Sequence, residues 1–261
     1  MRLVLKIGGV ALEQPDTLQS CVRAIKALAS DGHQLVVVHG GGTVLTRTLK
    51  KLGKESEFIN GLRVTDAETR DVALMVLAGL MNKAMVGALT KAGISAMGLS
   101  GGDGQVFLAR KRTGNGPDLG FVGDICSVET EWLETIWRAG GVPVVSSIAL
   151  GTDGEYYNVN ADQMASACAV ACQAHALIFL TEVPGVLDAS GAPIRQLELK
   201  DVPTLVNSSV IKGGMLPKLE ACKKALTGGV GRVRIFPADK ADALSEFYLK
   251  KIEFGTEVVA A

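Results

Sequence analysis

Strand-like apolar runs rich in β-branched residues alternate with longer Ala- and Leu-rich stretches through most of the chain. The runs are apolar at nearly every position, which is typical of strands that helices cover on both faces. This alternation predicts parallel β-α-β units and an α/β fold. The predicted strands are residues 2–7, 34–39, 94–99, 142–146, 176–181 and 232–236, and the predicted helices are residues 16–30, 44–52, 66–92, 129–139, 162–173 and 215–227.

Polar, glycine-rich segments interrupt this alternation at residues 102–104, 114–120 and 152–154. Such segments favour tight turns, so we expect small antiparallel hairpins at the edge of the sheet. Residues 188–212 form the least regular stretch, and we expect a flap between two lobes there.

The charge balance and the cysteines restrict the classes of function. Lys plus Arg and Asp plus Glu both number 27, and no basic cluster is visible, which argues against nucleic acid and anionic membrane as partners. The first apolar stretch is shorter than a membrane span and contains Lys6, so we expect a cytoplasmic protein. Five scattered cysteines predict reduced thiols. Neither the cysteines nor the three histidines have the spacing of a metal site, so none is expected.

Two predicted strands end in glycine-rich loops, at Lys6-Ile7-Gly8-Gly9 and at His39-Gly40-Gly41-Gly42. Ligands of open α/β sheets bind at the carboxyl ends of strands. Glycines there let backbone N–H groups approach a phosphate or carboxylate, and a following helix adds its positive dipole end. Tight turning alone explains one glycine pair more easily than two such loops. A lysine within a buried strand is expensive unless it has a partner, so Lys6 is a candidate functional residue.

Three further segments carry candidate residues. Lys218 follows a glycine pair in the first turn of a predicted helix, where the macrodipole disfavours a cation unless an anion is near; a solvated helix lysine is the alternative. Asn158, Asn160 and Asp162 end a strand and begin a helix, and Asp162 is either a functional carboxylate or a helix N-cap. Arg63 precedes a long helix and is either a carboxylate ligand or a surface arginine.

The candidate residues are two lysines, backbone amides, an aspartate and an arginine, and no nucleophile with its base is among them. This set favours phosphoryl transfer, which needs mainly positioning and neutralisation of charge. No G-x-x-x-x-G-K-[ST] motif occurs, which argues against a P-loop enzyme. The dinucleotide fingerprint is broken at Leu45, which weakens a dehydrogenase hypothesis. Gly98-Leu99-Ser100-Gly101-Gly102 matches a hydrolase elbow, but a turn and another strand follow it where a helix is needed.

Five motifs in this order, Lys-Ile-Gly-Gly, His-Gly-Gly-Gly, Asn-Gly-Leu-Arg-Val-Thr-Asp, Asn-Val-Asn-Ala-Asp-Gln and Gly-Gly-Met-Leu-Pro-Lys, resemble the amino-acid kinase family and its acetylglutamate kinase branch. The resemblance runs from Met1 nearly to the C-terminus. It implies a three-layer α/β/α sandwich with a mainly parallel central sheet. It also implies one domain over residues 1–261, with a substrate lobe at about 1–174 and a nucleotide lobe at about 175–261.

The resemblance implies ATP-dependent phosphorylation of the γ-carboxylate of N-acetyl-L-glutamate in arginine biosynthesis, with ATP and Mg²⁺ as cofactors. Lys6 and Lys218 would stabilise the transferring phosphoryl group, and Asp162 would hold both lysines. Gly41 and Gly42 would contact the substrate, and Arg63 and Asn158 would hold its α-carboxylate. The implied nucleotide contacts are Gly8, Gly9, Glu182, Val183, Pro184, Gly185, Val186, Leu187, Val210, Ile211 and Lys212.

Two positions depart from the family's pattern: Thr43-Val44-Leu45 stands where many members have a proline, and Glu182 stands where aspartate is usual. Family members that arginine inhibits are hexamers with an extra helix before the first strand. Here the strand begins at Arg2, so we expect a homodimer without arginine feedback. The alternatives are a kinase for an acylated aminoadipate, a non-catalytic sensor of amino acid and nucleotide, and a dehydrogenase.

Overall fold

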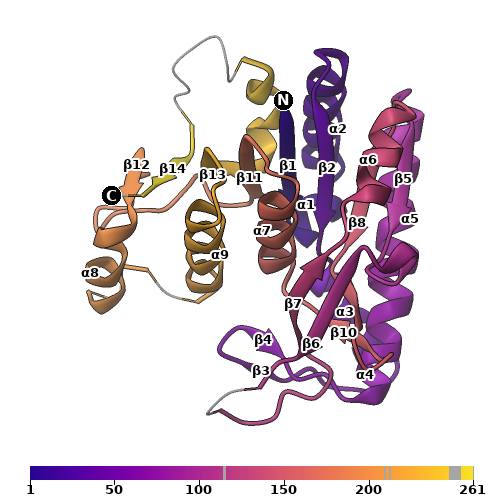
Figure 1. Cartoon of the computed structure of the whole chain (residues 1–261). Helices are drawn as coiled ribbons and strands as arrows, with labels where there is room; N and C mark the ends of the chain where they lie inside the picture. The colour runs from indigo at the N-terminus through magenta and orange to yellow at the C-terminus, as the bar shows by residue number, and fades with distance from the viewer. Residues whose placement is uncertain (114–115, 209, 212, 247–253, 261) are drawn as a thin grey trace. The chain divides into compact units, whose positions relative to one another are not determined.

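The computed structural model describes residues 1–113, 116–208, 210–211, 213–246 and 254–260 (Figure 1). The chain forms two compact units. The first combines Met1–Leu35 with Ala165–Ala261, and the second is Val36–Met164. The predicted lobe boundary between residues 174 and 175 stays a prediction.

The first unit is built on a mainly parallel sheet. Strand β1 (Arg2–Ile7) pairs in parallel with β11 (Ala176–Thr181), which pairs in parallel with β13 (Val233–Pro237). The order continues through β14 (Thr256–Val259), antiparallel to β13, to β12 (Gln196–Glu198). All six residues of β11 are buried, which explains why this run is apolar throughout.

Helices lie on both faces of this sheet: α7 and α9 on one side, α2 and the 3₁₀ segment η4 on the other (Figure 1). Helix α2 begins with Pro15, whose fixed φ suits the first helical turn, and buries Cys21, Ile25 and Leu28 at helical spacing. This layering confirms the predicted α/β class. The helical segments are α1 (Gly9–Glu13), α2 (Pro15–Ser30), α7 (Ala161–Ala171, shared with the second unit), η3 (Leu199–Asp201), α8 (Val202–Asn207), α9 (Met215–Thr227) and η4 (Ala238–Glu246).

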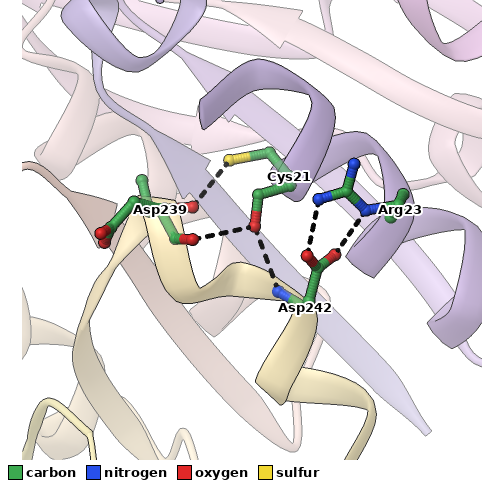
Figure 2. A network of polar contacts seen from close by, with 6 residues as sticks. Cys21, Arg23, Asp239 and Asp242 are labelled. Atoms are coloured by element: carbon green, nitrogen blue, oxygen red, sulfur yellow. Dashed lines mark hydrogen bonds and ion pairs between the residues drawn. The ribbon is translucent and has the colours of Figure 1, made fainter. Parts of the chain in front are cut away.

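Polar contacts fasten η4 to α2 (Figure 2). The Ser20 hydroxyl donates to the Asp239 carbonyl at 3.3 Å and accepts from the Asp242 N–H at 3.3 Å. The buried Cys21 thiol donates to the Ala238 carbonyl at 3.7 Å. Arg23 donates to both carboxylate oxygens of Asp242, at 3.1 and 2.7 Å.

The stretch at residues 188–212 is more regular than predicted. It contains β12, whose pairing with β14 makes it part of the sheet, and helix α8. The Asp188 carboxylate closes the turn before β12 by accepting from the Ser190 and Ala192 N–H groups. A flap role for this stretch stays a prediction.

The second unit contains a parallel sheet of β2 (Gln34–His39), β8 (Val142–Ser146) and β5 (Ala96–Leu99). A second sheet has the order β10-β9-β6-β7. We predicted hairpins at the edge of the main sheet, but the strands around residues 112–122 and 152–155 form this separate sheet. Residues 103–105 form a 3₁₀ turn rather than a hairpin. The further strands are β3 (Phe58–Ile59), β4 (Leu62–Arg63), β6 (Phe107–Lys111), β7 (Gly123–Val128), β9 (Ile148–Gly151) and β10 (Tyr156–Asn158).

The long helix predicted at residues 66–92 is continuous but not uniform. It consists of α4 (Ala67–Ala73), a π-helical segment η1 (Leu74–Met81) and α5 (Asn82–Lys91). Asp66 caps it by accepting from the Thr69 N–H. Its 25 residues are long and apolar enough to cross a membrane, a test that core helices of soluble proteins also pass. The remaining helices of this unit are α3 (Gly42–Lys51) and α6 (Glu131–Arg138).

Candidate active site

The glycine loop, residues Gly40–Gly42, joins buried strand β2 to helix α3. The Gly41 carbonyl accepts from the Leu45 N–H at 2.9 Å, and the Gly42 carbonyl accepts from the Thr46 hydroxyl at 2.9 Å. The N–H groups in the first turn of a helix have no intrahelical acceptor. This loop therefore has backbone donors and a positive dipole end that suit an anion. Substrate contact by Gly41 and Gly42 stays a prediction.

Arg63 is buried rather than on the surface, so the surface alternative was wrong: its exposed fraction is 6%. The guanidinium donates to the Ser56 hydroxyl, to the Thr46 hydroxyl at 2.8 Å and to the Gly42 carbonyl at 3.0 Å. It lies 4.6 Å from the centre of the Phe58 ring. Within the described ranges no carboxylate pairs with it, and burial lowers its pKa. A buried cation in such surroundings favours an anionic ligand.

Asn158 is linked to Arg63 through one residue. The Asn158 side-chain amide donates to the Thr65 hydroxyl at 3.3 Å, and that hydroxyl donates to the Arg63 carbonyl at 2.9 Å. Thr65 is fully buried. The structure therefore brings the Arg63 guanidinium to Gly42 and links Asn158 to the Arg63 backbone through Thr65. Sequence reasoning missed Ser56, Thr46 and Thr65, whose hydroxyls are recognisable only once the fold brings them to Arg63.

Asp162 lies in the first turn of α7 but does not cap it. The cap is Asn160, whose side-chain oxygen accepts from the N–H groups of Asp162 at 2.9 Å and Gln163 at 3.2 Å. The N-cap alternative for Asp162 was therefore wrong. Its side chain is 6% exposed, which leaves a buried carboxylate at the start of the helix.

Lys6 and Lys218 both neighbour Phe179 in the first unit. Lys6 and Phe179 are register partners on adjacent parallel strands, so their side chains share one face of the sheet. The Lys218 ammonium lies 5.1 Å from the centre of the Phe179 ring. Lys218 is 8% exposed, which excludes the solvated-lysine alternative. The predicted lysines thus lie on the same face, against one buried aromatic ring.

Two helices extend from this region. On α7, Asp162 stands one turn before Ser166, whose hydroxyl donates to the Ala221 carbonyl of α9 at 2.9 Å. Lys218 stands almost one turn before Ala221.

The first glycine pair differs from the prediction. The Gly8 N–H donates to the Leu180 carbonyl at 3.2 Å, so this amide supports the pairing of β1 with β11. Helix α1 begins at Gly9 and is only five residues long, and α2 follows from Pro15. A helix therefore does begin at this loop, as expected, but it is short. A nucleotide contact by Gly8 or Gly9 stays a prediction.

The predicted nucleotide loop follows β11. Thr181 stabilises its start, because its hydroxyl donates to the Val183 carbonyl at 2.9 Å. Gly185 has a φ of 146°, and an added Cβ would lie 2.6 Å from the Thr256 hydroxyl oxygen. That oxygen accepts from the Val186 N–H at 2.8 Å. Thr256 is a supporting residue that sequence reasoning missed, because it stands on the last strand, far away in the chain.

The other nucleotide candidates differ in exposure. Glu182, Val183 and Pro184 are exposed, Leu187 and Val210 are half-buried, and Val186 and Ile211 are buried. The Val186 and Ile211 N–H groups already donate within the protein, to the Thr256 hydroxyl and to the Leu205 carbonyl, so a nucleotide contact by either residue stays a prediction. Lys212 lies outside the described residues.

The hydrolase alternative has no support in the geometry. The Ser100 hydroxyl donates to the Asp103 carboxylate at 2.8 Å, and a 3₁₀ turn follows where a nucleophile elbow needs a helix. No group of three or more His, Cys, Asp or Glu side chains suited to a metal ion is found in the part of the chain that the structure describes. All five cysteines are free thiols, and only Cys126 is exposed.

Comparison with known proteins defines the class. Residues 1–237 match the model of the amino acid kinase family, so the chain belongs to this family. It is 59% identical to the acetylglutamate kinase of Acidobacterium capsulatum, over the full length of both chains. It is 55% identical to the acetylglutamate kinase of Koribacter versatilis, over 100% of this chain and 99% of the relative.

Two solved structures share the fold. A protein of Streptococcus mutans superimposes with a TM-score of 0.83 at 31% identity, covering 100% of this chain and 99% of that one. The N-acetylglutamate synthase of Neisseria gonorrhoeae, solved with coenzyme A and N-acetyl-glutamate, has a TM-score of 0.86 at 25% identity. That match covers 99% of this chain and 59% of the synthase.

Proposed function

We propose that the protein transfers the γ-phosphoryl group of ATP to the γ-carboxylate of N-acetyl-L-glutamate, in the pathway to arginine. The observation that carries this proposal is the buried guanidinium of Arg63, which meets only neutral partners among the described residues. A substrate α-carboxylate supplies the missing anion. Full-length identity of 59% and 55% to relatives named acetylglutamate kinase supports the same substrate.

The reaction needs no enzyme nucleophile. A γ-carboxylate oxygen of the substrate attacks the γ-phosphorus, the bond to the β–γ bridging oxygen breaks, and ADP leaves as an acyl phosphate forms. Negative charge spreads over the transferring group and the leaving oxygen. In this proposal Lys6 and Lys218 neutralise that charge, Asp162 orients the lysines, and the Gly41 and Gly42 amides hold the acceptor carboxylate.

Bound Mg²⁺ would screen the phosphates of ATP. We assign its coordination mainly to phosphate oxygens and water, because Mg²⁺ keeps several waters and takes few protein ligands. The carboxylates among the candidate residues are Asp162, which is buried, and Glu182, which is exposed.

A coupled ADP-release assay tests the function. We expect the highest kcat/KM with N-acetylglutamate, and lower values with N-acetylaminoadipate, aspartate and glutamate. Lys6→Ala and Lys218→Ala should each lower kcat by on the order of 10² to 10³, the loss typical of one preorganised charge donor. Lys91→Ala, at the exposed end of α5, is the matched control. Preference for N-acetylaminoadipate would instead establish the sister kinase, and nucleotide binding without turnover would establish a sensor.

We also propose a homodimer that works in the cytoplasm. The helix from Ala67 to Lys91 presents Met75 and Leu80 outward, 69% and 60% exposed. This apolar face has the acidic Asp71 near one end and the basic Lys83 near the other, both exposed. An antiparallel pairing with a second copy would cover the apolar residues and bring opposite charges together. Five free thiols are consistent with a reducing compartment.

A further inference from the structure

Two buried polar side chains, His39 and Asn82, support the glycine loop within the second unit. Both are fully buried. His39 is the last residue of β2, and Asn82 is the first residue of α5, directly after the π-helical segment. We infer that Asn82 is a positioning residue for acetylglutamate binding, which fixes the tautomer of His39 and thereby the direction of the Gly40 carbonyl. This inference rests on the proposed function.

The neighbours of Asn82 allow only one orientation of its amide. Its nitrogen lies 2.9 Å from the Val144 carbonyl oxygen, and its oxygen lies 3.2 Å from the Lys83 ammonium. A carbonyl can only accept and an ammonium can only donate. With the amide flipped, its oxygen would face the Val144 carbonyl oxygen and its nitrogen would face the Lys83 ammonium, so neither hydrogen bond could form.

The Asn82 amide in turn determines which ring nitrogen of His39 carries the proton. The Asn82 nitrogen lies 3.1 Å from Nε2 of His39 and can only donate, so Nε2 must accept. The proton of the neutral ring is then on Nδ1, which lies 3.0 Å from the Gly40 carbonyl and donates to it. Burial, with a contribution from the Lys83 charge, lowers the pKa of His39 to about 4, so the ring is neutral near pH 7.

All three carbonyls of the glycine loop are then hydrogen-bonded within the protein. Gly40 accepts from His39, Gly41 from Leu45, and Gly42 from Thr46 and Arg63. The N–H groups in the first turn of α3 have no intrahelical acceptor, which suits this end of the helix to an anionic ligand. With the other tautomer, Nδ1 and the Gly40 carbonyl would face each other as two acceptors, and the peptide would turn to separate them.

The π-helical segment η1 also contacts the glycine loop directly, at Gly41. An added Cβ on Gly41 would lie 2.8 Å from Cδ2 of Leu77 and 3.0 Å from Cγ of Met81. Leu77 and Met81 therefore pack directly on Gly41, in the same segment that ends at Asn82. π-Helical turns occur frequently at functional sites.

Three substitutions separate the parts of this relay. Asn82→Leu keeps the bulk but removes both donors. In His39→Asn, the side-chain nitrogen takes the position of Nδ1 and still donates to the Gly40 carbonyl. In His39→Gln, the side-chain nitrogen takes the position of Nε2 and cannot donate to the Gly40 carbonyl. We expect Asn82→Leu and His39→Gln to lower kcat/KM for acetylglutamate by on the order of 10²-fold, mainly through KM, with the KM for ATP changed less than about twofold. His39→Asn should retain most of the wild-type kcat/KM.

Leu89→Ala is the matched control, because Leu89 is fully buried on the same helix. It should lower stability and leave the KM for acetylglutamate unchanged. Wild-type kcat/KM in folded Asn82→Leu, or equal losses in His39→Asn and His39→Gln, would overturn the inference.

A second readout needs no substrate. Nitrogen-15 NMR of the ring nitrogens distinguishes the two tautomers, and the chain has only three histidines. We expect wild-type His39 to be the neutral Nδ1–H form from about pH 5 to 8, and this signature to be lost in Asn82→Leu. An Nε2–H signal in the wild type would overturn the inference. A wild-type protein with the expected tautomer but no turnover of acetylglutamate would contradict only the proposed function.

Discussion

At the scale of single residues, Arg63 donates a hydrogen bond to the glycine loop, and its positive charge can bind an anionic ligand. Its planar group makes three hydrogen bonds in different directions, which an ammonium on a flexible stem does not reproduce. We expect Arg63→Lys to raise the KM for acetylglutamate about 10- to 100-fold, the equivalent of one charged hydrogen-bonded pair. The KM for ATP, measured in the same assay, is the internal control. An unchanged KM for acetylglutamate would assign the carboxylate elsewhere.

His39 makes a separate prediction about acid stability. Its pKa is lowered from 6.5 to about 4 in the folded protein, mainly by burial. The unfolded chain therefore binds the proton more tightly, and the free energy of unfolding falls as the pH drops through this window. The loss from this group is on the order of 3 kcal/mol between pH 6.5 and 4.

Urea unfolding at several pH values checks this, with His39→Asn as the reference because asparagine does not titrate. The wild type should lose more stability than the variant on acidification. Parallel curves would show that His39 is protonated equally easily in both states.

The residue scale also shows what sequence can and cannot predict. Lys6 and Lys218 were candidates because a cation in an apolar run or at a helix start needs an anion, and Arg63 was a candidate because a guanidinium suits a carboxylate. The structure shows that Arg63 and Lys218 are buried, and the roles of all three stay predictions. Asn160 and Asp162 were harder to separate, because either side chain can cap a helix, and only hydrogen-bond geometry assigned the cap to Asn160. The sequence did not indicate a role for Asn82, because a single amide in an apolar helix does not show which strand it will contact in the fold.

At the scale of elements, Ser20 makes two of the hydrogen bonds that join η4 to α2. Its hydroxyl both donates and accepts, and the residue is 2% exposed. We expect Ser20→Ala to destabilise this contact by about 1–2 kcal/mol, because two buried backbone groups lose their partner. The exposed Arg23–Asp242 ion pair should matter much less, so Arg23→Gln is the control.

Thiol labelling detects this local opening. The Cys21 thiol is buried, and its pKa is raised to about 12 by burial and by the Asp242 charge, so it should react only when η4 moves away. With Cys126→Ser removing the exposed thiol, Ser20→Ala should speed Cys21 labelling about tenfold. Equal rates in both backgrounds would mean that this contact does not limit access to Cys21.

The elements themselves were predictable to different degrees. The observed bounds of the buried strands agree closely with the predicted ones. A strand that is covered on both faces is apolar throughout, so its first and last residues are easy to locate in the sequence. The antiparallel strands were placed wrongly, since their turns reveal hairpins but not which sheet the hairpins join. The π-helical segment could not be predicted at all, because its apolar sequence, Leu74 to Met81, is equally compatible with an α-helix.

At the scale of the whole molecule, the outward apolar face of the helix from Ala67 to Lys91 predicts the assembly. Met75 and Leu80 stand on it without any charged residue between them. If two copies pair through this face, a glutamate in place of either residue would be buried against apolar surface, at a cost of several kcal/mol in the absence of a partner. Met75→Glu and Leu80→Glu should therefore each convert the dimer to a monomer in light scattering.

Leu52→Glu is the control, since Leu52 is as exposed, at 63%, but follows a different helix. It should leave the dimer intact. A wild-type monomer or hexamer would contradict the pairing directly, and a dimer that survives both helix substitutions would move the interface to another face. Because the helix also carries Leu77, Met81 and Asn82 on its inner side, loss of the dimer should raise the KM for acetylglutamate if pairing helps to hold the helix against the glycine loop.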